Sequence, residues 1–167
     1  RLMVGRDVIL KVNKSKAEPK DVVLRVKTLN YVDELGKRVL KDINLAVRSG
    51  EILGVAGVEG NGQRELVEII TGLRKCSSGE IEINGRLING LTIKQIRNLK
   101  TSHIPEDRMT YGVSSDGIIE ENLISDRYDE KELNKSIFLN MSKISELSQS
   151  LVKQFRIKCS SPKQSVK

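Results

Sequence analysis

A run of glycines between an apolar segment and an amphipathic segment constrains this chain most strongly. Residues 51–70 read EILGVAGVEGNGQRELVEII, with glycines at positions 57, 60 and 62. The apolar residues 52–56 are typical of a strand, and apolar residues at helical spacing follow from Gln63 onward. A glycine-rich loop between a strand and a helix can turn its backbone N–H groups inward, and the helix N-terminus adds partial positive charge. The stretch therefore predicts a phosphate-binding loop over residues 57–65.

Two side chains depart from the usual chemistry of such a loop. The glycine spacing matches a P-loop, in which a lysine and then a serine or threonine follow the last glycine. Gln63 and Arg64 stand at those positions, so the phosphates lose a cation and magnesium loses its hydroxyl ligand. Arg64 either pairs with a phosphate or lies along the helix, and Glu65 adds negative charge. We therefore expect ATP to bind weakly and magnesium to lack its usual protein ligand.

The backbone N–H groups of the loop do not depend on side chains, and they can still hold a phosphate. The candidate nucleotide-binding residues are Gly57, Gly60, Asn61, Gly62, Gln63, Arg64 and Glu65. We expect no catalytic residue and no dedicated metal ligand in the chain. A dinucleotide-binding Rossmann loop is excluded by spacing, because Glu65 stands where that motif requires a glycine.

Composition narrows the class of protein. The chain has 167 residues, of which 38% are hydrophobic and 31% charged, as expected for a folded domain with a core. No apolar run approaches the roughly 20 residues that span a bilayer, so we expect a cytoplasmic protein without direct membrane insertion. The net charge of +7 comes with only three tyrosines and two phenylalanines, which favours a solvated basic surface over nucleic-acid binding. Cys76 and Cys159 lack metal-ligand spacing and predict two free thiols.

The periodicity of the remaining sequence predicts antiparallel strands first, then the glycine loop and then mostly helices. This order indicates a mixed α/β architecture in which antiparallel strands precede a parallel core. The expected strands cover residues 22–29, 39–47, 52–56, 80–84, 86–88 and 101–104, and the expected helices cover 63–73, 93–99 and 137–157. Thr92 is expected to cap the second of these helices.

Several motifs together resemble the nucleotide-binding domain of ABC transporters. The run LKDINLAV at residues 40–47 and the turn at 50–51 lead into the glycine loop, as they do in that family. The run SGEIEING at 78–85 is similar to the hairpin that follows the P-loop helix there. The segment HIPEDR at 103–108 falls at the family's Q-loop, with Glu106 in place of the glutamine. The resemblance implies a P-loop NTPase, ABC-type ATP-binding core with an antiparallel β subdomain.

The resemblance is closest to the second half of the tandem ATPases that serve monosaccharide and nucleoside importers. It implies a linker over residues 1–21 and a partial nucleotide-binding domain over 22–160, with the Q-loop region at 104–108 and part of a helical subdomain at 116–157. A polar tail is expected over 161–167. The family's signature motif, its Asp-Glu strand and its switch histidine are absent, so we expect a fragment that is truncated before the signature motif.

Three residues outside the loop have both a functional and a structural interpretation. Tyr31 falls near the family's adenine-stacking aromatic, or it packs on a hairpin. Glu106 either approaches metal or water and contacts the membrane subunit, as the family's glutamine does, or it only shapes a turn after Pro105. His103 precedes the Q-loop and is expected in the core, on the predicted strand 101–104.

Two functions from different classes remain open. The resemblance implies the ATP-binding, energy-coupling subunit of an ABC importer for nucleosides or simple sugars, located at the cytoplasmic face of the membrane. Its partners would be the transmembrane permease subunits and the first ATP-binding half of the same chain, with no nucleic acid. The fragment itself is expected to be inactive. The alternative is a non-catalytic scaffold or regulatory module that keeps the fold and binds a protein partner rather than nucleotide.

Overall fold

The computed structural model describes residues 17–167, and the fold divides into two compact units between Ser102 and His103. Each unit has its own cluster of buried hydrophobic side chains. Most of the expected linker over residues 1–21 lies outside the described residues.

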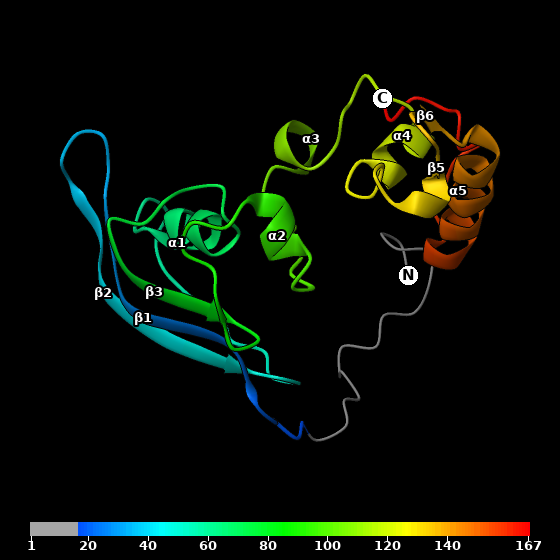
Figure 1. The fold of residues 1–167 in the computed structure, drawn as a ribbon. Coiled ribbons are helices and arrows are strands. Elements are labelled where there is room, and N and C mark those ends of the chain that lie inside the picture. Colours follow the sequence, from blue (N-terminus) through cyan, green and yellow to red (C-terminus); the bar gives the residue numbers. More distant parts are fainter. Residues whose placement is uncertain (1–16) are drawn as a thin grey trace. The chain divides into compact units, whose positions relative to one another are not determined.

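The first unit is built on a four-stranded antiparallel sheet with the order β2-β1-β3-β4 (Figure 1). The turn between the two long strands forms because Asp33 Oδ1 accepts hydrogen bonds from the backbone N–H groups of Leu35 and Lys37, at 3.0 and 2.8 Å. The next hairpin turns at Asn84 and Gly85, both with positive φ, as the favoured two-residue hairpin turn requires. The strands are β1 Val22–Val32, β2 Arg38–Arg48, β3 Ser78–Ile83 and β4 Arg86–Leu87.

A bulge keeps the apolar side chains of β1 on one face. The register of β1 against β2 shifts between Val26 and Leu29, and both residues are buried although they are three positions apart. Thr28 lies in the bulge with a φ of 46°, which is rare for a β-branched residue. The side chain of Asn44 on β2 accepts a hydrogen bond from the Thr28 backbone N–H at 2.9 Å. The strand therefore carries an apolar core face along its length despite the broken alternation.

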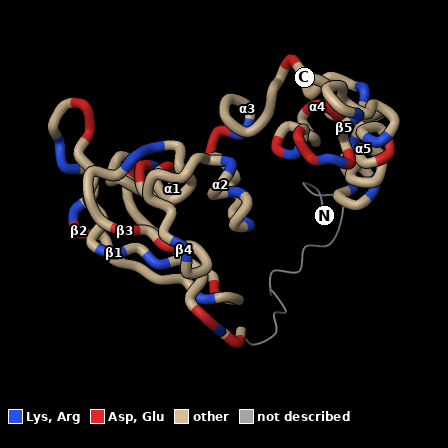
Figure 2. Tube along the Cα trace, in the orientation of Figure 1, with Lys and Arg blue, Asp and Glu red and all other residues tan. Residues whose placement is uncertain are grey.

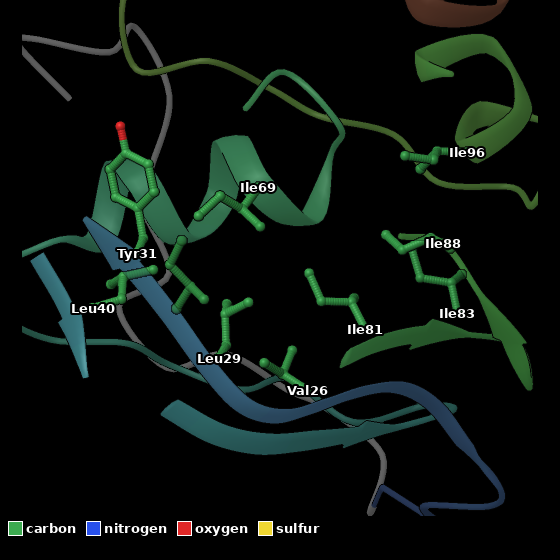
Figure 3. Close-up of a cluster of buried hydrophobic side chains, with 10 residues drawn as sticks. Val26, Leu29, Tyr31, Leu40, Ile69, Ile81, Ile83, Ile88 and Ile96 are labelled. Carbon is green, nitrogen blue, oxygen red and sulfur yellow. The ribbon is translucent and has the colours of Figure 1, made fainter. Parts of the chain in front are cut away.

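Two helices pack on the core face of this sheet. Helix α1 spans Gln63–Ile70 and contributes Leu66 and Ile69, and helix α2 spans Ile93–Arg97 and contributes Ile96. Figure 3 shows Ile69 and Ile96 among the buried side chains of the sheet. The expected cap on α2 is confirmed, because the Thr92 side chain accepts from the backbone N–H of Gln95 and the Gln95 side chain accepts from that of Thr92. The buried cluster consists of Val26, Leu29, Tyr31, Leu40, Leu66, Ile69, Ile81, Ile83, Ile88 and Ile96.

Two expected strands do not form. Residues 51–58 have no regular secondary structure and are exposed, with Ile52 at 96% of its full exposure. Residues 101–104 are also without a strand, and His103 is half-buried rather than in a core strand. A strand needs a hydrogen-bonded neighbour, and none pairs with either segment within residues 17–167. The expected parallel pairing is therefore not formed in this part of the chain.

The second unit is a small helical assembly around Ile124, Leu133 and Ile144. Helix α5 is shorter than the sequence predicts, because residues before it turn at Ser136 and pair as a small hairpin. The segment expected as a polar tail is tied to the start of α4, where Ile119 N–H donates to the Gln164 carbonyl at 3.0 Å. The elements are α3 Arg108–Tyr111, α4 Ile119–Ile124, the 3-10 helix η1 Lys131–Leu133, β5 Asn134–Lys135, β6 Phe138–Leu139 and α5 Met141–Phe155.

Charged side chains of both signs are interspersed along both units (Figure 2). Lys27 on β1 and Glu82 on β3 form a cross-strand ion pair at 2.9 Å. Both cysteines are free thiols, as expected. Across residues 17–167, no helix is long and apolar enough to cross a membrane. In the same range, no three His, Cys, Asp or Glu side chains are grouped so that they could hold a metal ion.

Candidate functional site

The glycine loop leads directly into α1, and two of its glycines have left-handed backbone conformations. Gly60 has a φ of 82° and Gly62 a φ of 97°. A Cβ on Gly62 would lie 2.8 Å from Leu40 Cδ2, so a larger residue would also collide with the sheet. Gly62 is therefore required both by its conformation and by its packing. The tight turn expected from the glycine spacing is present.

The N-termini of α1 and α4 have no side-chain cap, whereas those of α2, α3 and α5 do. Thr92, Asp107 and Asn140 each accept a hydrogen bond from a first-turn N–H group of the helix that they precede. Gly62 stands at the corresponding position of α1 and has no side chain that could do so. The first N–H groups of an α-helix have no intrahelical acceptor. The first turn of α1 therefore presents the partial positive charge of the helix N-terminus without a side-chain cap.

The side chain of Gln63 folds back onto the loop. Its Nε2 donates a hydrogen bond to the backbone carbonyl of Val58 at 3.3 Å. That carbonyl also accepts from the backbone N–H of Asn61, again at 3.3 Å. The Gln63 side chain thus contacts the backbone of the loop itself. A P-loop lysine at this position would instead offer its positive charge to bound phosphates.

Arg64 lies along α1 and pairs with Glu68. Its Nε is 2.9 Å from Glu68 Oε1, and the other carboxylate oxygen of Glu68 is 2.7 Å from an Arg74 nitrogen. Burial opposes the ionisation of Glu68, but hydrogen bonds from Arg74 and Arg64 outweigh it and lower the pKa of that carboxyl. The hydrogen bond to Glu68 raises the pKa of Arg74. In this structure the Arg64 side chain therefore lies along α1.

Tyr31 is the last member of this network. Its side chain is buried with 7% exposure, its hydroxyl accepts a hydrogen bond from Arg74, and the Arg74 guanidinium lies 5.1 Å from its ring centroid. A cation over an aromatic face is a favourable arrangement. The Tyr31 ring thus packs in the buried cluster of the first unit and against the Arg74 guanidinium.

Glu106 belongs to the second unit, whereas the glycine loop belongs to the first. It is exposed in the segment before α3. The next residue, Asp107, caps α3 by accepting from the backbone N–H groups of Met109 and Thr110, at 3.1 and 3.0 Å. Hydrogen bonds from Thr110 lower the pKa of Asp107. A cavity of about 260 Å³ lies beside this helix, lined by Tyr111, Gly112, Val113, Ser114, Glu121, Asn122 and Ser125.

The structure thus brings together the loop residues 57–65, and it connects Arg64 to Tyr31 through Glu68 and Arg74. Sequence reasoning missed these two intermediate residues. The i, i+4 spacing of Arg64 and Glu68 signalled their pairing. Arg74 lies six residues after Glu68, beyond the helix end, so only the folded chain shows that contact.

Comparison with known proteins identifies relatives of this chain. The family model described as ABC transporter matches residues 40–164. The nucleoside import ATP-binding protein NupA of Lactococcus lactis subsp. cremoris is 40% identical over 157 residues, covering 94% of this chain and 31% of the relative. The glucose import ATP-binding protein TsgD13 of Haloferax volcanii is 33% identical, covering 94% of this chain and 28% of the relative. The chain therefore spans about a third of the length of these relatives.

A solved structure shares the fold. A dimeric ATP-binding cassette in a post-hydrolysis state, bound to ADP and Pi, matches with a TM-score of 0.61 and 17% sequence identity. The match covers 85% of this chain and 61% of that structure's chain. At this identity the likeness is one of fold alone.

Proposed function

Because the chain belongs to the ABC transporter family, we propose that it is part of the ATP-binding, energy-coupling subunit of an importer for nucleosides or simple sugars. The names of its relatives support this function, and the higher identity to a nucleoside importer than to a glucose importer favours nucleosides. In this proposal the chain holds a nucleotide at the glycine loop.

The observation that carries the proposal is the open N-terminus of α1. Gly62 leaves the first-turn N–H groups without a side-chain cap, next to two glycines that curl the backbone. When bound, magnesium would neutralise phosphate charge, but Gln63 and Arg64 supply neither the lysine nor the hydroxyl of a complete site. Glu65 adds a negative charge in the first turn of the helix. The site therefore binds ATP weakly through its backbone and does not hydrolyse it.

The proposed partners are the permease subunits of the importer and the first ATP-binding half of the same protein. The exposed Glu106 and the cavity beside α3 offer a surface for a permease contact in the second unit. The protein would then work at the cytoplasmic face of the membrane without inserting into it.

Restoring the two missing side chains tests the proposal. Gln63→Lys combined with Arg64→Ser adds a phosphate cation and a magnesium hydroxyl at the start of α1. A charge-assisted hydrogen bond contributes about 1.5–3 kcal/mol, so MgATP should bind about tenfold more tightly or better. Calorimetric titration of both proteins with MgATP measures this gain. Gln154→Lys, at an exposed position of α5, introduces the same charge away from the loop and should leave the affinity unchanged.

The second candidate function is a scaffold or regulatory module that binds a protein partner instead of nucleotide. This function is supported by the contacts of the two side chains that stand in place of the P-loop lysine and hydroxyl. Within the first unit, Gln63 contacts Val58 and Arg64 contacts Glu68. If the double variant keeps its fold by circular dichroism and still does not bind MgATP, the loop has lost its shape for phosphate and the scaffold function is supported.

A further inference from the structure

The carboxamide of Gln63 occupies the space that a side chain at position 57 would need. A Cβ built on Gly57 would lie 1.8 Å from Gln63 Nε2 and 2.9 Å from Gln63 Cδ. The same Nε2 donates to the Val58 carbonyl at 3.3 Å. The first residue of α1 therefore reaches across the loop and contacts its opposite end.

This contact gives Gly57 a different role from the other loop glycines. Gly60 and Gly62 have positive φ, whereas Gly57 does not. The three described atoms nearest to a Cβ built at position 57 all belong to the Gln63 side chain. Gly57 leaves room for the Gln63 carboxamide, which would have to move if position 57 carried a side chain.

We propose that Gln63 is an autoinhibitory contact built into the loop, and that a phosphate must displace its carboxamide in order to bind. The inference rests on the proposed function, since it assumes that the loop receives a nucleotide phosphate. The carboxamide is a neutral donor already committed to the Val58 carbonyl, and it fills the loop next to the open N-terminus of α1. Displacement breaks this hydrogen bond and moves the side chain away from Gly57, which lowers the affinity for phosphate.

The contact itself is tested by a double-mutant cycle in the 167-residue chain. Gly57→Ala, Gln63→Ala and the combination of the two are compared with the original chain by urea unfolding. Gly57→Ala should slightly destabilise the original chain, because its Cβ displaces the flexible carboxamide and its hydrogen bond to the Val58 carbonyl. In the Gln63→Ala background it should have no such effect, so the two changes are coupled. Additive effects would overturn the inference.

The inhibition is tested by MgATP titration of the original chain and of Gln63→Ala. Removing the carboxamide should tighten MgATP binding about fivefold, the factor that corresponds to a neutral hydrogen bond of ~1 kcal/mol. Val67→Ala, at an exposed position one turn further along α1, is the matched control and should not change the affinity. Equal or weaker binding by Gln63→Ala would overturn the inference while leaving the proposed function standing.

The two experiments separate this inference from the proposed function. If neither the original chain nor Gln63→Ala binds MgATP, the proposed function fails. The double-mutant cycle then tests only whether Gln63 contacts position 57. Coupled effects would show that the Gln63 side chain contacts position 57 of the loop. Additive effects would show that it does not.

Discussion

Glu68 is the residue through which three side chains around α1 are held together. Its carboxylate contacts Arg64 on one side and Arg74 on the other, and Arg74 covers the ring of Tyr31. Its side chain is only 17% exposed, so solvent screens these ion pairs less than those on the outer face of the sheet. One carboxylate thereby fixes the position of the arginine nearest the glycine loop.

Replacement of this carboxylate should have a pH-dependent effect on stability. Glu68→Gln should lower the free energy of unfolding at pH 7 by about 1–3 kcal/mol, because two charged hydrogen bonds are lost. The folded-state pKa of Glu68 is lowered, so its contribution is complete above the unfolded pKa and is lost as the pH falls through the folded pKa. The difference between the two proteins in urea unfolding should therefore shrink as the pH falls below the ordinary pKa of a glutamate, about 4.3.

A matched control comes from the outer ion pairs of the same unit. Glu80 lies 3.7 Å from Lys27 and both side chains are about half exposed. Glu80→Gln should have a much smaller effect at pH 7, since exposed pairs contribute little. Equal losses for the two variants, or a loss at Glu68 that does not change with pH, would contradict the role assigned to Glu68.

At the scale of secondary-structure elements, the segment that leads into the loop is the main departure from expectation. Residues 52–58 have strand-forming side chains, yet they are exposed and unpaired in the sheets of residues 17–167. The neighbouring strands β1 and β3 are paired along most of their length and contribute to the buried cluster.

Hydrogen exchange should distinguish these elements. Amides of residues 52–58 should exchange rapidly because no ladder protects them, whereas central amides of β1 such as Val26 should be among the slowest. Mass spectrometry of peptides after exchange in deuterated buffer measures both. Slow exchange across 52–58 would show that this segment is a paired strand after all.

Local signals predicted the elements that depend on neighbouring residues. The hairpin at Asn84, the cap at Thr92 and the turn into α1 were all indicated by side chains within a few positions. The prediction of a strand over residues 52–56 was wrong, because a strand forms only beside a partner strand, and the local sequence does not show whether one is present. The glycine spacing also predicted which residues form the loop. The contact of the Gln63 side chain with Gly57 was not predicted, because it depends on three-dimensional packing.

At the scale of the whole molecule, the chain has the fold of an ATP-binding cassette without the side chains of a complete P-loop. The family model covers residues 40–164, which include the loop and parts of both units. The similarity of fold is shared with a cassette that binds ADP and Pi. The fold is thus retained although Gln63 and Arg64 stand at the two positions where a P-loop carries its lysine and its serine or threonine.

The chain should not hydrolyse ATP. Gln63 brings no charge to the phosphates and Arg64 cannot ligate magnesium, so the transition-state charge is not neutralised. Phosphate release from MgATP by the purified chain should equal that of buffer alone, in an assay with an active ATPase as a positive control. Release that saturates with nucleotide and scales with protein concentration would contradict this expectation.

The most direct test of the account is a titration of the ¹⁵N-labelled chain with MgATP, followed by the backbone amide resonances. We expect saturable shifts centred on the amides of residues 60–65, since Gly62 gives the first turn of α1 no side-chain cap. Strands β3 and β4, away from the loop in sequence, should shift little. Saturating MgATP that leaves residues 60–65 unchanged would contradict the claim that this loop holds the nucleotide phosphates.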